Sequence, residues 1–292
     1  MKIRICLSIL CLNLVFAAGI VFAQKKVRTA VVKGPEKGTL LIVGGGRMSD
    51  QLVERFIALA GGKDAPIVVI PTALGAESYD ERRMAFLKRR GATNVSILHT
   101  NDREMANDDD FLAPLKKAKA VWFGGGRQWR LVDSYKNTKA EKEFWNVLKR
   151  GGVIGGSSAG ATIQGSYLAR GDTNNNQTMM GDHEEGFGFL SNTAIDQHVL
   201  ARNRHFDMFT ILKKRPELLG LSIDEGTAVV VKGDEFTVYG SSYVLVYDRS
   251  FWSREGSRLK NLPDANALFF FLRAGDRYDL KKRKVIPRRR VR

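Results

Sequence analysis

Cysteine is nearly absent from this sequence of 292 residues: Cys6 and Cys11 are the two it contains, and both lie near the N-terminus. A chain trimmed to begin at Gln24 would contain no cysteine, which excludes disulfides, thiol catalysis and cysteine-ligated metal sites from it. Histidine is also scarce, with 4 residues, and no spacing of ligand-type residues matches a metal-binding pattern. We therefore expect no metal site.

Acidic residues are in short supply, with 31 Asp and Glu against 47 Lys and Arg, so the formal net charge is +16. Much of the excess lies in the C-terminal run 281–292, which could attract nucleic acid, anionic lipid or an acidic polymer. The run contains no aromatic residue for stacking on bases. We interpret it as a solvated, partly disordered segment ending in a basic tail at 287–292, and we expect no nucleic-acid partner.

The first residues combine a basic start with a long apolar run. Lys2 and Arg4 precede the uncharged residues 5–22. This pattern predicts a signal peptide over 1–23, followed by a polar linker over 24–38. The protein would then be exported, periplasmic or extracellular, and would have no stable membrane insertion after cleavage. An uncleaved membrane anchor is the alternative, because the run is close to the length that spans a bilayer.

Beyond the linker, short apolar runs that mostly end in Gly or Pro alternate with stretches of helical spacing. This alternation predicts a parallel, doubly wound sheet covered by helices on both faces. Near the C-terminus, apolar runs alternate with turn residues, which predicts an antiparallel meander. The expected strands are 39–43, 67–70, 95–98, 120–123, 194–199, 221–225, 228–231, 236–239 and 243–246, and the expected helices are 51–60, 80–90, 129–135, 140–148, 159–168 and 202–213.

Three glycines, Gly44 to Gly46, follow the first expected strand and invite comparison with a dinucleotide-binding turn. In that motif a third glycine would stand at the position of Ser49, because it is needed for close packing of helix on strand. We therefore reject dinucleotide binding.

An apolar run that begins at Val153 enters a turn of small residues and leaves into a helix-compatible stretch. Within it, Gly156 to Gly160 form a G-x-S-x-G frame centred on Ser158, which predicts a nucleophilic serine on a strained elbow. The backbone N–H of Ala159, at the start of the helix, could then help to hold an oxyanion. The alternative is a glycine-rich turn with an incidental serine.

A nucleophilic serine needs a base, and His198 is the histidine that we favour among the 4 in the chain, because it follows a strand in a polar cluster. A carboxylate must then orient the imidazole. Glu225, and as second choice Asp224, lies at a strand end from which it could reach the ring. The order Ser, His, Glu differs from the Ser, acid, His order of common hydrolases with this elbow.

Four motifs follow one another along the chain: Phe123–Gln128, Gly155–Ala161, Asp196–His198 with Arg202 and Arg204, and Ile223–Ala228. With these motifs in this order, the sequence resembles cyanophycinase and its relatives among the S51 serine peptidases. The resemblance runs from about residue 38 to 286 and implies an S51 peptidase catalytic domain over 39–286. It also implies an α/β fold: a three-layer α/β/α sandwich with a mostly parallel sheet, class I glutamine amidotransferase-like (flavodoxin-like), with a C-terminal antiparallel β extension.

The resemblance implies a role for individual residues. Ser158 would be the nucleophile, His198 the general base and acid, and Glu225 its orienting partner. Backbone N–H groups of Ala159, Gly125 and Gly126 would form the oxyanion hole. No organic cofactor is required. The residues implied to contact substrate are Gln128, Ser157, Asp196, Gln197, Arg202 and Arg204.

The implied substrate is cyanophycin, a poly-aspartate whose side-chain carboxyls carry arginine, or a related β-aspartyl-arginine or aspartyl peptide rich in Asp and Arg. One departure is Asp207, which stands where the family pattern has a further arginine and puts strict cyanophycin specificity in question. An α-aspartyl dipeptidase of the same family and a non-catalytic binding protein on this fold are the alternatives. A homodimer stays open as the assembly state.

Overall fold

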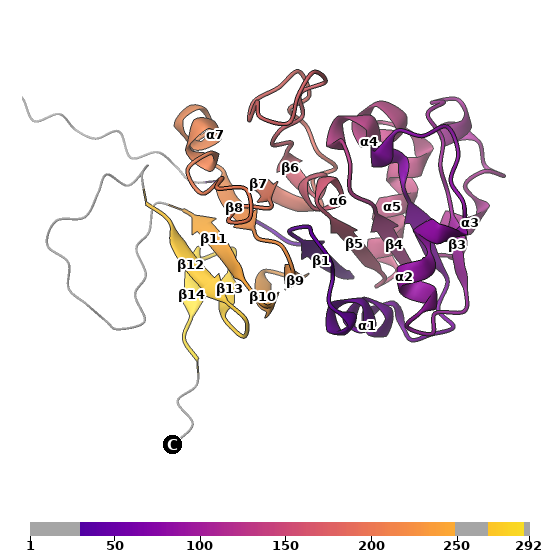
Figure 1. Cartoon of the computed structure of the whole chain (residues 1–292), viewed down its shortest axis with the longest axis horizontal. Helices are drawn as coiled ribbons and strands as arrows, with labels where there is room; N and C mark the ends of the chain where they lie inside the picture. The colour runs from indigo at the N-terminus through magenta and orange to yellow at the C-terminus, as the bar shows by residue number, and fades with distance from the viewer. Residues whose placement is uncertain (1–29, 249–267, 289–292) are drawn as a thin grey trace, which may run out of the picture.

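The computed structural model of the protein describes residues 30–248 and 268–288. The expected signal peptide, 1–23, and the end of the basic tail, 289–292, lie outside these ranges. The described residues form two β-sheets with helices packed around them (Figure 1). Among these residues, no helix has the length and apolar character needed to cross a bilayer.

The larger sheet confirms the predicted α/β class. Its strand order is β14-β13-β10-β9-β1-β5-β4-β2-β3, and the strands from β1 to β3 in that order are parallel. These five are buried or half-buried along their whole length, as expected for strands covered on both faces. The parallel strands are β1 (Thr39–Val43), β2 (Ile67–Ile70), β3 (Val95–Ile97), β4 (Ala120–Phe123) and β5 (Val153–Ser157). The antiparallel edge is β9 (Thr227–Lys232), β10 (Glu235–Gly240), β13 (Arg277–Asp279) and β14 (Lys284–Ile286).

The smaller sheet corrects the prediction of a single C-terminal meander. Its order is β12-β11-β8-β7-β6. The strand β11 therefore lies in a different sheet from β9 and β10, and it pairs with β8. Apolar spacing identifies a strand but does not identify its partner, which is why the sequence did not show this change of sheet. The strands are β6 (Gly165–Tyr167), β7 (Leu190–Gln197), β8 (Leu219–Ile223), β11 (Tyr243–Tyr247) and β12 (Phe270–Arg273).

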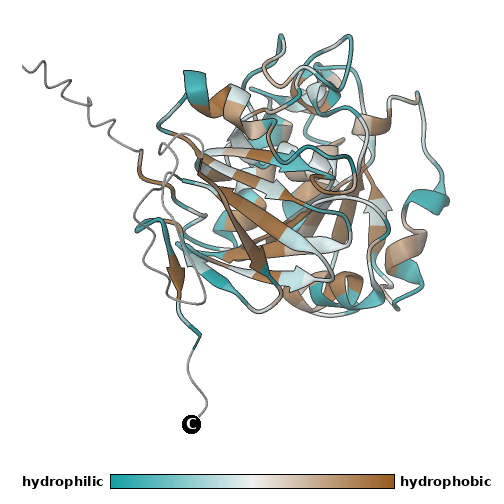
Figure 2. Ribbon diagram, turned by 60° about the vertical axis from the view of Figure 1, so that its left-hand side comes forward, coloured by the Kyte–Doolittle hydropathy of each residue, from teal (hydrophilic) through white to brown (hydrophobic). Residues whose placement is uncertain are grey.

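Side chains on the two faces of β1 lie in different layers of the core. Leu41 and Val43 pack with residues of α1 (Asp50–Ala60) and α2 (Ala85–Lys88). Leu40 and Ile42 belong to the larger core cluster, which also includes residues of several other helices and of the smaller sheet. The smaller sheet therefore packs, together with helices, on one face of the larger sheet, where the prediction had helices alone. Figure 2 shows the strands as largely hydrophobic, with hydrophilic residues mainly in loops and on parts of the helices. The remaining longer helices are α3 (Ala113–Lys117), α4 (Gln128–Tyr135) and α5 (Lys139–Lys149).

Three predicted helices differ from the observed ones. The helix expected over 159–168 is the single turn α6 (Ala159–Thr162), after which the chain enters β6. The helix expected over 202–213 begins later, as α7 (Met208–Lys214). Helical spacing does not reveal that the backbone at Gly165 approaches Thr193 too closely for a side chain, which fixes β6 beside β7. The helix expected over 80–90 is divided into η2 (Glu81–Arg83) and α2, and the other 3₁₀ turns are η1 (Thr72–Leu74) and η3 (Met105–Asn107).

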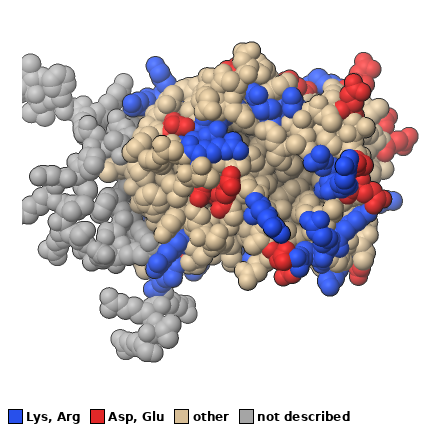
Figure 3. Space-filling view, in the orientation of Figure 1, with Lys and Arg blue, Asp and Glu red and all other residues tan. Residues whose placement is uncertain are grey.

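The described parts of the expected linker and of the basic run contact the rest of the fold. Val32 is fully buried, and the N–H of Lys33 donates to the Ser191 hydroxyl over 2.9 Å. Near the C-terminus, β14 pairs with β13, and Arg288 donates to Asp276 over 3.0 Å. On the face seen in Figure 3, Lys and Arg side chains lie in separate groups among acids, so the basic charge of this face is dispersed.

Candidate active site

Ser158 occupies the turn between β5 and α6, where the sequence predicted a strained elbow. Its backbone has φ 57° and ψ −113°, a left-handed conformation that is costly for a residue with a side chain. The flanking glycines are needed because a Cβ at Gly156 would lie 2.2 Å from the carbonyl oxygen of Gly160, and one at Gly160 would lie 2.1 Å from that of Phe123. The glycine frame therefore permits the turn that presents the serine.

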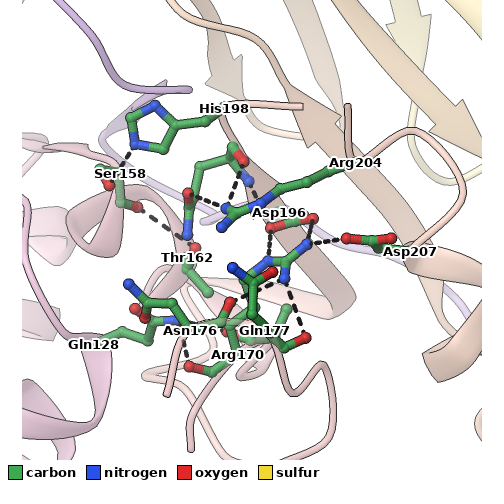
Figure 4. Close-up of polar contacts among 12 residues, drawn as sticks. Gln128, Ser158, Thr162, Arg170, Asn176, Gln177, Asp196, His198, Arg204 and Asp207 are labelled. Atoms are coloured by element: carbon green, nitrogen blue, oxygen red, sulfur yellow. Dashed lines mark hydrogen bonds and ion pairs between the residues drawn. The ribbon is translucent and has the colours of Figure 1, made fainter. Parts of the chain in front are cut away.

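The three side chains of the predicted catalytic set form one hydrogen-bonded chain. Ser158 Oγ lies 2.9 Å from His198 Nε2, and His198 Nδ1 lies 2.5 Å from Glu225 Oε1 (Figure 4 shows the Ser–His contact). His198 directly follows β7, and Glu225 follows β8 by two residues. Asp224, the second choice, instead accepts the N–H groups of Leu200 and Ala201, so it holds the turn after the histidine rather than the ring.

The hydrogen-bond partners define the proton positions that the site needs. As a carboxylate, Glu225 can only accept a hydrogen bond, so a neutral His198 ring donates from Nδ1 and leaves Nε2 to accept the Ser158 hydroxyl. Burial lowers the pKa of His198 below its usual value of 6.5, Glu225 opposes this shift, and the nearby Arg202 adds to it. The neutral form, which can act as a base, is therefore favoured near neutral pH.

The glycines after β1 make room for the histidine and its acid. A Cβ at Gly45 would lie 2.2 Å from His198 Cε1, and one at Gly46 would lie 2.6 Å from Glu225 Oε2. Both glycines have a positive φ, and the carbonyl of Gly44 accepts the N–H of His198. Sequence reasoning missed this role. The available signal was a glycine run after a strand that fitted no phosphate-binding motif.

Two of the three predicted oxyanion donors lie beside the serine. A Cβ at Gly125 would be 3.4 Å from Ser158 Cβ, and Ala159 is the first residue of α6, where N–H groups have no partner within the helix. Gly126 instead packs against η1, because its Cβ position lies 2.1 Å from the carbonyl oxygen of Ala73. The structure therefore brings Gly125 and Ala159 next to Ser158, while the role of all three N–H groups as donors stays a prediction.

The structure does not place Asp196 on a pocket surface. Its side chain is fully buried and forms an ion pair with Arg170, with Arg170 Nε 2.8 Å from Asp196 Oδ1. Arg170 also approaches Asp207 to 2.5 Å (Figure 4). Sequence reasoning missed Arg170, because nothing in local spacing links it to a residue 26 positions later.

Three other predicted substrate contacts have defined surroundings. Gln128 is fully buried, and its Nε2 donates to the carbonyls of Ala169 and Arg170, while its Oε1 has no partner among the described residues. Gln197 is nearly buried and accepts a hydrogen bond from Arg204. Ser157 ends β5 and is half-buried.

Arg204 is a buried cation without an acidic partner. Its residue is 4% exposed, and Nη1 donates to the backbone and side-chain oxygens of Gln197 over 3.3 and 3.2 Å. Within residues 30–248 and 268–288, no carboxylate lies within ion-pair distance of it. Burial, and then the positive charge of Arg170, lower the pKa of Arg204. Its side chain extends toward Ser158 and His198 in Figure 4, whereas Arg202 is exposed. The charge of Arg204 also lowers the pKa of His198, so the guanidinium lies near the predicted base. A buried, unpaired guanidinium in this place can bind an anionic group of a ligand.

In the described part of the chain, no group of three His, Cys, Asp or Glu side chains is arranged to hold a metal ion. The other histidines have different surroundings. His99 contacts Thr72, and His183 lies between Asp133 and Asp182.

Comparisons with known proteins identify the relatives of the chain. The sequence profile described as Peptidase family S51 matches residues 40–239. The chain is 30% identical over 258 residues to the cyanophycinase of Geminocystis herdmanii (strain PCC 6308), over 84% of this chain and 94% of that protein. It is 31% identical over 221 residues to the cyanophycinase of Synechococcus elongatus, over 73% of this chain and 68% of that protein.

Solved structures are similar as well. A peptidase from an acI-B1 Actinobacterium is similar with a TM-score of 0.57 and 26% identity, over 84% of this chain and 98% of that one. A putative peptidase E protein from Listeria monocytogenes EGD-e has a TM-score of 0.51 and 19% identity, over 70% of this chain and all of that one, and shows the fold alone.

Proposed function

The chain belongs to peptidase family S51 and is a serine-type peptidase, and from this premise we propose that it hydrolyses cyanophycin or related aspartyl peptides through an acyl-enzyme on Ser158. The curated relatives at 30% and 31% identity are cyanophycinases, which supports this substrate class. The observation that carries the choice of an acidic substrate is Arg204, a buried guanidinium without a carboxylate partner among the described residues, whose charge acts on the ring of His198.

The hydrogen-bonded chain supports acyl transfer. Ser158 Oγ attacks the carbonyl carbon of the scissile amide while His198 Nε2, 2.9 Å away, takes the hydroxyl proton. Glu225 keeps the ring oriented and stabilises the imidazolium that forms. His198 then gives the proton to the leaving amine. A water, deprotonated by the same nitrogen, releases the acyl group and restores the serine.

The negative charge that develops on the substrate carbonyl oxygen is stabilised by hydrogen-bond donors that are in place before the reaction. The N–H groups of Gly125 and Ala159 lie beside Ser158 and can supply them. In other serine peptidases, each such donor contributes about 3–4 kcal/mol to transition-state stabilisation. Because the N–H of Ala159 belongs to the first turn of α6, the backbone holds it in place before the substrate binds.

Arg204 gives the site a preference for negative charge. A free carboxylate of an aspartyl residue next to the scissile bond can accept hydrogen bonds from the guanidinium, which in the described residues donates to Gln197. Pairing also relieves the cost of a buried unpaired cation. A substrate with an amide in place of that carboxylate gains neither benefit.

Export is a further part of the proposal, and it rests on the sequence of residues 1–23. Expression of the full chain in a bacterial host, followed by cell fractionation and intact-mass analysis, tests it. We expect the protein in the periplasm or medium with Gln24 as its first residue. Retention of residues 1–23 in a membrane fraction would instead support an anchor.

The test of the activity compares the purified protein with the variant Ser158→Ala. Both are incubated with cyanophycin and with a panel of α- and β-aspartyl dipeptides, and the products are identified by mass spectrometry. We expect β-Asp-Arg release or aspartyl peptide cleavage by the unmodified protein and none by the variant. Cleavage of α-aspartyl dipeptides alone would identify an aspartyl dipeptidase. Binding without turnover of any substrate would contradict the proposed activity and indicate a binding protein.

A further inference from the structure

Arg170 has every N–H of its guanidinium engaged. Nε donates to Asp196, Nη2 donates to Asp196 and Asp207, and Nη1 donates to the carbonyls of Asn176 and Gln177. A guanidinium has five N–H bonds, and these five contacts account for all of them. The side chain is fully buried, so it is held in one place on every side.

The backbone of Arg170 is fixed as well. Its N–H donates to the carbonyl of Met179 over 3.0 Å, and its own carbonyl accepts Nε2 of Gln128 over 2.8 Å. Its φ of 58° is unusual for a residue with a side chain. A conformation of this kind persists where surrounding contacts hold it, and here they hold the guanidinium against Asp196.

Because Asp196 pairs with Arg170, few acceptor positions on its two carboxylate oxygens stay open to another cation. Oδ1 accepts from Arg170 and from the N–H of Gln197, and Oδ2 accepts from Arg170 over 3.0 Å. Asp207 Oδ2 is also directed at Arg170. Asp196 and Asp207 are the two acids whose charges raise the pKa of Arg204, and both are thus paired with another arginine.

We propose that Arg170 is a specificity-determining positioning residue, which keeps Arg204 available for a substrate carboxylate by pairing with Asp196 and Asp207. Without Arg170, the fully buried Asp196 would lose its cation, and an uncompensated buried charge is strongly unfavourable. Arg204 is a buried guanidinium without a carboxylate partner among the described residues, and the charges of both acids act on it, so it would turn to these acids. The site would then lose its preference for acidic substrates. This assignment rests on the proposed function, because it takes Arg204 as the group that receives the substrate carboxylate.

The experiment measures the preference for an acidic substrate, as the ratio of kcat/KM for an acidic peptide to kcat/KM for its amide counterpart. We would determine kcat and KM for an aspartyl peptide that the protein cleaves and for its counterpart with the free aspartyl carboxyl converted to an amide. The variants are Arg170→Met, Asp207→Asn, and a triple variant with Arg170→Met, Asp196→Asn and Asp207→Asn. Arg215→Met removes an arginine that pairs with Glu217 at the surface and is the matched control. Thermal unfolding of each protein reports its folding.

For Arg170→Met, we expect the ratio of kcat/KM for acid over amide to fall by roughly 10- to 100-fold, the size of one hydrogen bond to a charged group. The change should lie mostly in KM for the acidic peptide. The triple variant has no acid left to attract Arg204, so we expect its ratio to return toward that of the unmodified protein. Asp207→Asn, which leaves the Arg170–Asp196 pair in place, and Arg215→Met should leave the ratio unchanged.

A purely structural role for Arg170 would lower the rates for both peptides together and keep their ratio constant, which would overturn the proposal. If Arg170→Met does not fold, Arg170→Lys replaces it, since one ammonium cannot reproduce the five contacts. The ratio should still fall for the lysine variant and should recover when Asp196→Asn and Asp207→Asn are added to it, and failure of either result would also overturn the proposal. An unmodified protein that cleaves neither peptide, or both equally, would refute the proposed function instead.

Discussion

The ring of His198 lies directly against the backbone of Gly45: a Cβ at this glycine would stand 2.2 Å from Cε1 of the ring and 2.6 Å from both ring nitrogens. The contact joins the turn after β1 to the residue after β7, two elements far apart in the sequence. It explains why a glycine with φ 121° follows β1, where a nucleotide-binding motif had to be rejected. The absent side chain makes room for the base.

The first prediction follows from this contact. Gly45→Ala should lower kcat by about 100-fold or more, because the methyl group displaces the ring from Ser158 and small misplacements of catalytic groups have effects of this size. Gly62→Ala is the control, since Gly62 has a similar φ of 110° but no atom within 4 Å of its Cβ position. Both variants carry the strain of a side chain at positive φ, and Gly45→Ala also carries the clash with the ring, so thermal unfolding should show the larger loss of stability for Gly45→Ala. Equal activity of the two variants would show that the contact is unimportant.

The second prediction concerns the orienting acid. Glu225→Gln should lower kcat by a factor on the order of 10⁴ while the fold is retained, because an amide can donate to Nδ1 and so favour the wrong tautomer of His198. Steady-state kinetics with a cleaved aspartyl peptide measure this. Glu235→Gln, which alters a surface acid paired with Arg277, should leave kcat unchanged. A small effect at Glu225, equal to that at Glu235, would exclude an orienting role.

The third prediction is a shift in pH dependence. The pKa of His198 lies below 6.5 chiefly because of burial, and Arg202 lowers it further. His198 acts as a base when neutral, so activity is lost as the pH falls through this pKa. Removing the positive charge in Arg202→Gln should raise the pKa and move the acidic limb of kcat/KM, which reports the free enzyme, to higher pH.

The measurement uses an amide-containing peptide, so that loss of Arg202 does not also remove a contact to a substrate carboxylate. Since Arg202 is exposed, the shift should shrink as salt is added. Arg215→Gln, a change distant in sequence from the histidine, should leave the profile in place. A shift of the acidic limb to lower pH after Arg202→Gln would have the wrong sign and would contradict the electrostatic account.

Much of the parallel sheet could be predicted because its strands carry a local signal. The runs Thr39–Val43, Ile67–Ile70 and Ala120–Phe123 are continuous and apolar, and all three match observed strands residue for residue. The elbow around Ser158 was also visible, since glycine at fixed offsets reports a backbone constraint within five residues. Strand ends then pointed to His198 and Glu225, whose roles in catalysis await the measurements above.

The sequence by itself determined which segments are buried and where the chain turns sharply. Both properties have a local signal, because apolar runs report burial and glycines at fixed offsets report a backbone constraint. The tertiary structure decided which segments meet. It paired β11 with β8 rather than β10, placed Gly45 under His198, and set Arg170 against Asp196. An ion pair between residues 26 positions apart leaves no periodic pattern in the sequence, because sheet register and the path of the loop bring its partners together. For that reason Asp196, predicted as a substrate contact, proved to be the partner of an arginine that no motif contains.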